Sequence, residues 1–380
     1  MEKVLDFMST GRNDGGQVRA RDLGIPFDGQ PGPLNAITDV AGVEVGFTTL
    51  IEGDGPLVIG KGPVRTGVTV IHPRGKAGAF DGVWAGRFSL NGNGEMTGIH
   101  WIDEAGAFSG PVAITNTHSV GLAHHGILRW LIQHPDFKPE TQLWMLPVSA
   151  ETCDEYLNDI NGQHVNEEHV LAACDNATGG AVPEGNVGGG TGMICYEFKG
   201  GTGTASRRCT IKGETFTTGV LVQANFGARH DLSVRGVPVG RHLTENTLWK
   251  TPPHMNAQGS IIAIAITDAP LMPLQLQRIA KRVGLGIART GTPSENGSGD
   301  IFLAISTGNE VSDMGNDVDP TLRYLSNHDL DPLFLATVEA TEEAIINALV
   351  AAKTMTGQAD HTVHAVDHEE LQAIMKQYGR

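Results

Sequence analysis

Short apolar runs bounded by polar or turn-forming residues recur along the chain. Residues 261–266 read Ile-Ile-Ala-Ile-Ala-Ile, and residues 301–305 read Ile-Phe-Leu-Ala-Ile. Runs of this length without alternation are typical of strands that are buried on both faces. Similar runs lie at residues 68–71, 111–115 and 218–225, and a further strand is expected to end near residues 143–148.

Helical spacing of apolar residues follows several of these runs. A polar turn at 116–119 leads into an expected helix at 120–131, and Pro273 is suited to the first turn of another helix. Asp331 and Pro332 form a good cap and first turn for a long helix. One face of the second helix would carry Leu276, Ile279, Ala280, Val283 and Ile287, and the inner stripe of the third would carry Phe334, Val338, Ile345 and Leu349.

The alternation of strands and helices predicts an α/β fold with layered elements. The segment of residues 1–35 is polar and rich in Gly and Pro, which is typical of an arm or loop. No linker-like segment divides the rest, so we expect a single domain over residues 1–380.

Glycine is unusually abundant. The chain has 50 glycines in 380 residues, against a usual share of about 7%. With 40% hydrophobic residues the chain is ordinary for a globular protein, so the glycines indicate tight turns and close backbone approaches. The cluster at 188–192 is interpreted as such a turn region, because the Lys and Ser/Thr of a phosphate-binding loop are missing.

The charge pattern excludes several kinds of partner. The net charge is −16 and no Lys/Arg tract is present, so a nucleic-acid partner is not expected. No apolar run reaches the length of a membrane span, and residues 1–6 lack a signal-peptide core. The four cysteines form no Cys-x-x-Cys pair, which favours reduced thiols and a cytoplasmic location, with export by another route left open.

Metal and nucleotide motifs are also missing. His368-Glu369 begins like a zinc-protease motif, but Gln372 stands where the second histidine is needed. His124 and His125 are adjacent and therefore cannot form an i, i+4 ligand pair. No Walker A loop, dinucleotide fingerprint or Gly-x-Ser-x-Gly elbow occurs, and we expect no metal and no organic cofactor.

The step from Gly259 to Ser260 is the most informative one for chemistry. It lies between a polar stretch and the apolar run at 261–266. If the bond before Ser260 were cut, one residue would carry both a hydroxyl nucleophile and a free amine able to act as its base. A plain loop that enters a strand is the alternative for this dipeptide alone.

Other polar groups lie at the ends of expected strands. Asn225 ends one strand, residues 296–300 with Ser298 and Asp300 precede another, and Glu151 follows a third. Acyl transfer needs a nucleophile, a group that manages its proton and donors for the developing oxyanion. These side chains could supply those roles, but their spacing does not show that they meet.

Motifs along most of the chain resemble one family. The chain is similar to the DmpA/BapA family, the L-aminopeptidase/D-Ala-esterase and β-peptidyl aminopeptidase group of self-processing hydrolases. The segments that carry the resemblance are residues 21–25, 35–46, 69–75, 91–95, 114–117, 221–227, 259–262 and 267–271.

The resemblance implies a fold and a maturation step. The fold would be a four-layer α-β-β-α sandwich that resembles the N-terminal nucleophile hydrolases with different strand connectivity. The precursor would cut itself between Gly259 and Ser260 into an α chain of residues 1–259 and a β chain of residues 260–380. Both chains would stay in one unit, and such units would form a homo-oligomer, commonly a tetramer.

The resemblance also implies the roles of the site residues. Ser260 would be the nucleophile, Ser298 and Asp300 a polar relay beside it, and Asn225 the side-chain oxyanion donor. Glu151 would hold the free amine of a short peptide, amide or ester that begins with an L-, D- or β-amino acid.

One position departs from the family pattern. Relatives often have Tyr two residues after the glutamate, whereas this chain has Cys153. A thiol is a weaker donor than a phenol. A backbone N–H, Tyr156 or a different substrate would account for the change, and a small buried cysteine that only enlarges the pocket is the alternative.

Three functions therefore compete. A serine aminopeptidase is favoured, with Ser260 as nucleophile. An ω-amide or nylon-oligomer hydrolase, or an acyltransferase like ornithine acetyltransferase, would typically have Thr at that position. An unprocessed, assembly-only homologue is the third, and the complete set of site residues argues against it.

Overall fold

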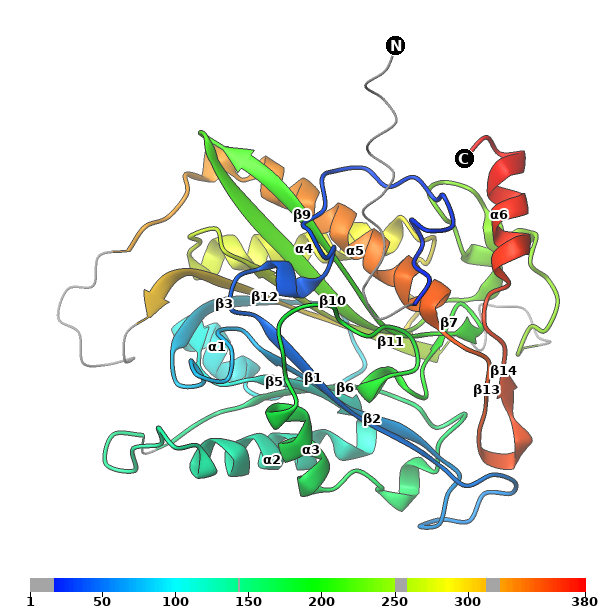
Figure 1. Cartoon of the computed structure of the whole chain (residues 1–380), viewed down its shortest axis with the longest axis horizontal. Coiled ribbons are helices and arrows are strands. Elements are labelled where there is room, and N and C mark those ends of the chain that lie inside the picture. Colours follow the sequence, from blue (N-terminus) through cyan, green and yellow to red (C-terminus); the bar gives the residue numbers. More distant parts are fainter. Residues whose placement is uncertain (1–16, 143, 250–257, 312–321) are drawn as a thin grey trace.

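The computed structural model describes residues 17–142, 144–249, 258–311 and 322–380. They form four layers, with two β-sheets face to face and helices on both outer sides (Figure 1). The predicted α-β-β-α sandwich is therefore confirmed. The expectations for residues 1–6, for residue 143 and for the polar stretch at 254–257 lie outside the described residues.

The larger sheet has six strands, and β11 and β12 lie at its centre. In spatial order its strands are β4 (Ala107–Phe108), β3 (Gly82–Gly92), β12 (Gly297–Val311), β11 (Gln258–Thr267), β10 (Glu214–Asn225) and β9 (Gly201–Ile211). Strand β12 runs parallel to β11, and the other neighbours are antiparallel. The helix α4 (Pro273–Ala288) connects the two parallel strands.

The smaller sheet has four strands. Their spatial order is β1 (Glu44–Glu52), β2 (Val64–His72), β5 (Val112–Asn116) and β6 (Val148–Thr152). Two hairpins of two-residue strands complete the described β-structure, namely β7 (Ile194–Cys195) with β8 (Phe198–Lys199) and β13 (Met355–Thr356) with β14 (Thr362–Val363).

Helices cover the outer faces of both sheets (Figure 1). Helix α4 and the long α5 (Asp331–Ala351) pack on the six-stranded sheet, and α2 (Val120–Gln133) with α3 (Glu167–Asp175) packs on the four-stranded sheet. The remaining helices are α1 (Ile99–Ala105) and α6 (His368–Gln377). No helix in the described part of the chain is long and apolar enough to cross a membrane.

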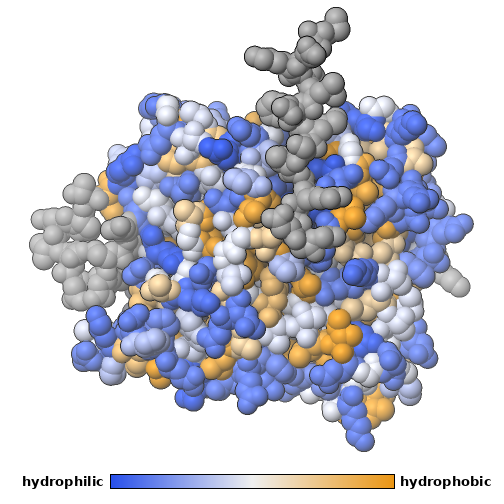
Figure 2. Space-filling model, in the orientation of Figure 1, coloured by the Kyte–Doolittle hydropathy of each residue, from blue (hydrophilic) through white to orange (hydrophobic). Residues whose placement is uncertain are grey.

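The apolar run in β11 is explained by burial on two sides. Ile262, Ile264 and Ile266 belong to the core between the sheets, whereas Ile261 and Ala263 pack toward the helical layer of α4 and α5. Successive side chains of a strand point to opposite faces, so a strand between two cores needs apolar residues at every position. On the face shown in Figure 2, hydrophilic residues predominate, with apolar patches between them.

Most predicted elements are present, with two corrections. All five apolar positions expected on one face of α4 are buried. The strand expected to end near 143–148 is wrong, because residues 144–147 have no regular structure and β6 begins at Val148. Trp144 is 58% exposed and packs edge-on against Trp101 on the surface. Asp331 is the first residue of α5, and Leu330 takes the cap position.

The N-terminal segment is anchored where the structure describes it. Arg19 is buried and its Nε donates to Glu184 at 2.7 Å. Arg21 and Arg207 both donate to the buried Glu343 of α5. The two ion pairs with Glu343 are among the contacts of α5, which is buried around nearly its whole circumference, although the sequence pattern predicts only one inner stripe.

Candidate active site

The candidate nucleophile lies in a row of residues across three central strands. Antiparallel pairing places Asn225, the last residue of β10, opposite Ser260 in β11. Parallel pairing places Gly299 of β12 on the other side of Ser260. The strands therefore bring together residues that are 35 and 39 positions apart.

Gly259 fits a place where no side chain has room. A Cβ atom at this residue would lie 2.4 Å from the carbonyl oxygen of Asn225 and 2.6 Å from the Cα of Phe226. Both contacts are to backbone, which cannot swing away as a side chain would. The bond before Ser260 is thus held tightly against the end of β10.

We expect Gly259→Ala to destabilise the chain by about 1–3 kcal/mol, because overpacking forces the backbone to shift. The same shift would move the 259–260 bond relative to Ser260 Oγ and slow any cleavage there. Thermal unfolding and the intact mass over time measure the two effects. Gly284→Ala is a suitable control, since its added Cβ would meet only side-chain atoms at 3.4 Å and 3.7 Å.

The Ser260 hydroxyl is held from the neighbouring strand. Its Oγ accepts a hydrogen bond from the Gly299 amide at 3.2 Å, and the residue is 7% exposed. Gly299 itself has no room for a side chain, because a Cβ would lie 2.4 Å from the carbonyl oxygen of Asn93. The loop after β3 therefore presses on β12 beside the nucleophile.

Ser298 and Asp300 form a buried pair next to this row. Ser298 Oγ donates to Asp300 Oδ1 at 2.6 Å, and Ser294 donates to the other carboxylate oxygen. Burial raises the pKa of Asp300, while the two serine hydroxyls act in the opposite direction. Both residues lie within β12, which begins at Gly297, so the expectation that they precede the strand is wrong.

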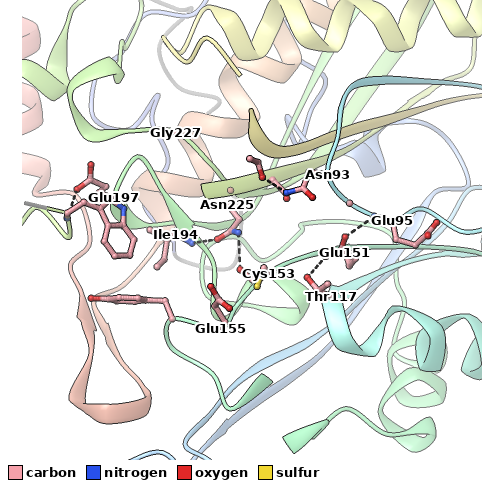
Figure 3. Close-up of a pocket in the computed structure, with 16 residues that line it drawn as sticks. Asn93, Glu95, Thr117, Glu151, Cys153, Glu155, Ile194, Glu197, Asn225 and Gly227 are labelled. Carbon is pink, nitrogen blue, oxygen red and sulfur yellow. Dashed lines mark hydrogen bonds between the residues drawn. The ribbon is translucent and has the colours of Figure 1, made fainter. Parts of the chain in front are cut away.

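The side-chain amide of Asn225 is held at both ends. Its Oδ1 accepts from the Ile194 N–H at 2.8 Å, and its Nδ2 donates to the Cys153 carbonyl at 3.0 Å (Figure 3). Because the Ile194 N–H can only donate, the Asn225 atom that faces it is the amide oxygen, and the other atom is the NH₂ nitrogen. Because an NH₂ group carries two hydrogens, the second remains to donate to a substrate.

Glu151 lies near the end of β6, on the facing sheet. It is 3% exposed, and its carboxylate accepts from the Glu95 N–H at 2.8 Å and from the Thr117 hydroxyl. Burial raises its pKa, and these two hydrogen bonds partly oppose that effect. The residue belongs to the strand, which corrects the expectation that it follows the strand.

Cys153 lines the same space as Glu151. Burial raises the pKa of its thiol to about 11, so the group is a neutral thiol near pH 7. Tyr156 also lines this space, and its ring stacks on His361 at 4.4 Å and meets Trp249 edge-on at 5.3 Å. The Tyr156 ring thus belongs to an aromatic cluster at the wall of the cavity.

These side chains surround a cavity of about 840 Å³. Ser260, Asn225, Glu151 and Cys153 all line it, whereas Ser298 and Asp300 lie behind its wall. Figure 3 shows Glu151 and Thr117 on one side of Asn225 and Glu197 on the other. Among the described residues, the charged side chains along the wall are those of Glu95, Glu151, Glu155 and Glu197, which are all acidic.

The arrangement is suited to acyl transfer from a substrate with a positive charge. It offers a serine hydroxyl, an amide donor and a buried carboxylate within one cavity. In the described residues, no group of three or more His, Cys, Asp or Glu side chains is placed to hold a metal ion.

Several residues around the site were not predicted from the sequence to belong to it. Asn93 donates to the Gly297 carbonyl at 2.6 Å, and Thr117 and Glu95 hold Glu151. All three lie in segments that carry the family resemblance, at 91–95 and 114–117. Glu197 lies outside the segments that carry the resemblance. Its carboxylate accepts hydrogen bonds from the main-chain N–H groups of Arg229, Leu248 and Trp249.

Comparisons with known proteins agree on one family. The model of peptidase family S58 matches residues 35–363. The chain is 51% identical to the β-peptidyl aminopeptidase BapA of Sphingosinicella microcystinivorans, over 95% of this chain and 93% of that protein.

Solved structures give the same result. The chain is similar to the L-aminopeptidase D-Ala-esterase/amidase of Ochrobactrum anthropi, with 49% identity and a TM-score of 0.87. The match covers 95% of this chain and 99% of that one. That structure is described as a prototype of the serine aminopeptidases and a variant of the Ntn hydrolase fold. A β-aminopeptidase from a Burkholderia species is 44% identical with a TM-score of 0.86, and the match covers 96% of this chain and 99% of that one.

Proposed function

This chain belongs to peptidase family S58 and is a serine aminopeptidase of the Ntn-hydrolase type, and from that premise we propose how Ser260 works. The chain would first cut itself between Gly259 and Ser260. The new N-terminal serine would then release N-terminal residues from short peptides, amides and esters. The observation that carries the proposal is the row of Asn225, Ser260 and Gly299 at the wall of a cavity that also contains Glu151.

The cleavage step would follow from the position of Ser260. Its Oγ attacks the carbonyl carbon of Gly259, the C–N bond breaks, and the serine nitrogen takes up a proton to become an amine. The resulting ester joins Gly259 to Ser260 Oγ, and water hydrolyses it to a Gly259 carboxylate and a free Ser260 hydroxyl. Strands β11 and β12 lie between β3 and β10, so both pieces would stay in one sheet.

In turnover the same hydroxyl would attack the acyl carbon of the substrate. The α-amine of Ser260, with an ordinary pKa of about 7.7–8.0, would take the proton and pass it to the leaving amine. The second hydrogen of Asn225 Nδ2 would stabilise the oxyanion. Ser298 and Asp300 would order the region beside the amine, and water would release the acyl group from Ser260.

Glu151 would select substrates with a free amine. A buried carboxylate that faces an ammonium forms a strong charge-assisted hydrogen bond. The acidic wall of the cavity favours the same charge. Because relatives are named β-peptidyl aminopeptidases, we include β-amino acids, beside L- and D-amino acids, among the first residues accepted.

Two measurements test the proposal together. The intact mass under denaturing conditions should give two species, residues 1–259 and 260–380. A panel of p-nitroanilides of L-Ala, D-Ala and β-Ala should be hydrolysed, and the N-acetylated forms should not. A single full-length mass with no turnover would refute the proposal. The homo-oligomer of processed units and the cytoplasmic location stay predictions, and light scattering tests the first.

We expect the pH dependence of kcat/KM to report Glu151. Its carboxylate must be ionised to bind an ammonium, and burial raises its pKa above the usual 4.5. The part of the activity that depends on Glu151 should therefore be present above this raised pKa and be lost as the pH falls through it, in addition to the loss that protonation of the Ser260 α-amine causes below about 7.7–8.0. The limb should be weaker in kcat, because bound ammonium favours the ionised form.

Glu151→Gln should remove the Glu151 part of this acidic limb, leave the part set by the Ser260 α-amine, and lower kcat/KM by about 10- to 100-fold, since a hydrogen bond to a charged group is lost. Glu155→Gln is the matched control, because Glu155 lines the same cavity with an exposed side chain. Equal effects of the two substitutions would contradict a specific role for Glu151.

A further inference from the structure

Lys199, at the end of β8, is completely buried, which is unusual for a lysine. Its Nζ donates to three main-chain carbonyls, those of Met193 at 2.8 Å, Gly200 at 3.0 Å and Gly190 at 3.4 Å. Burial lowers its pKa to about 7. The steps proposed for catalysis do not use this group, although it lies close to the residues that hold Asn225.

Two of the three carbonyls, those of Gly190 and Met193, belong to a strap, which we define as residues 190–194. The strap is packed with almost no free space. A Cβ at Gly190 would lie 2.3 Å from the Thr202 nitrogen, and a Cβ at Gly192 would lie 2.3 Å from the Arg65 carbonyl oxygen. Glycines allow the strap to lie this close to its neighbours, and the Lys199 ammonium adds a donor to the Gly190 and Met193 carbonyls, which also accept from the Met193 and Gly200 N–H groups.

The strap ends at the residue that orients Asn225. Ile194 is the cross-strand partner of Lys199 in the hairpin of β7 and β8, and its N–H donates to Asn225 Oδ1 at 2.8 Å. The two residues of the hairpin turn, Tyr196 and Glu197, have φ values of 52° and 59°. Such a turn needs tight support from its surroundings, because side-chain-bearing residues rarely adopt this conformation.

The strap also supports the other partner of Asn225. The Cβ of Asp154 lies 2.8 Å from where a Cβ of Gly192 would be, and the Cys153 carbonyl that accepts from Asn225 Nδ2 directly precedes Asp154. Thr152 Oγ1 contacts Met193 Sδ at 2.8 Å. A shift of the strap would therefore disturb both hydrogen bonds of the Asn225 amide.

We propose that Lys199 is a positioning residue for Asn225, and this inference rests on the function proposed for the site. Its ammonium holds the Gly190, Met193 and Gly200 carbonyls, and the strap in turn presents the Ile194 N–H to Asn225 Oδ1. The amide is then kept with Nδ2 toward the cavity. Lys199 touches no substrate, and it acts only by fixing the direction of the oxyanion donor.

The first test is Lys199→Met, which keeps the length and apolar stem of the side chain but cannot donate. We expect kcat for a β-Ala or L-Ala p-nitroanilide to fall by about 10²-fold, as for a misplaced reacting group. KM should stay within about twofold, because the end of the cavity with Glu151 is untouched. Each kcat is calculated from the concentration of cleaved protein, which intact mass measures.

A double-mutant cycle separates positioning from general damage. If Lys199 acts through Asn225, adding Lys199→Met to Asn225→Ala should lower kcat no further. Thr341→Val is the matched control, because it removes a buried hydrogen bond to a main-chain carbonyl, that of Thr337 in α5, outside both the strap and the cavity. Its effect on kcat should be small.

Several outcomes overturn the inference. An unchanged kcat in Lys199→Met, a loss that adds fully to that of Asn225→Ala, or an equal loss in Thr341→Val would each do so. If Lys199→Met does not fold, Lys199→Gln, a shorter neutral donor, should fold with a kcat between those of wild type and Asn225→Ala, and a wild-type kcat would refute the role. A wild-type protein without aminopeptidase activity would instead refute the proposed function.

Discussion

Replacing Ser260 with alanine is expected to give a folded, full-length chain that neither divides between Gly259 and Ser260 nor releases amino acids. The substitution removes one oxygen atom, whose described contact is the hydrogen bond from the Gly299 amide, so the fold should persist. Removal of a serine nucleophile lowers kcat by about 10⁶-fold in a well-studied hydrolase. Here the loss should be at least comparable, because the free amine would also never form.

Intact mass and p-nitroanilide hydrolysis check this expectation, with thermal unfolding as the measure of folding. Ser306→Ala is the matched control, since the buried Ser306 hydroxyl donates to the Ala269 carbonyl and does not line the cavity. Processing and turnover that survive in Ser260→Ala would show that another group is the nucleophile.

Asn225→Ala should have the second largest effect. Loss of one oxyanion donor costs about 2.7–4 kcal/mol of transition-state stabilisation, or about 10²–10³-fold in kcat. KM should change little, because the developing oxyanion is absent in the ground state. Asn225→Asp should be at least as slow, since its carboxylate would repel the oxyanion.

The hydrogen bonds of Asn225 to Ile194 and Cys153 require a second measurement. Both partners lose a buried interaction in Asn225→Ala, which should lower the free energy of unfolding by about 1–3 kcal/mol. Steady-state kinetics well below the unfolding temperature separates the two effects. A fall in stability without a fall in kcat would make Asn225 a structural residue only.

Much of the fold could be predicted from local patterns. The apolar run before Thr267 and the helical spacing after Pro273 depend on neighbouring residues, and the structure confirms both. The strand expected to end near residues 143–148 could not be told from a loop by apolar content, because an apolar side chain such as Trp144 can also lie on the surface, beside another indole. The ion pair between Arg19 and Glu184 joins residues 165 positions apart, and no local pattern encodes such a contact.

The site was predictable as a set of residues but not as an arrangement. The resemblance supplied Ser260, Asn225 and Glu151, and strand pairing is what places them around one cavity. The register of β11 and β12 also places Ser298 and Asp300 behind the wall, which their spacing could not reveal. Lys199 was overlooked, because a lysine beside glycines gives no sign in sequence that it is buried.

The central place of β11 and β12 in the larger sheet has a consequence for how the protein folds before cleavage and refolds after it. A chain cut before Ser260 would contribute two middle strands from one piece and their neighbours β3 and β10 from the other. Neither piece could then bury its apolar faces alone. Before the cut, folding would be a first-order event within one chain. After the cut, refolding would require an encounter between two chains, so its rate would fall on dilution. The cleaved molecule would therefore refold less readily than the precursor folds.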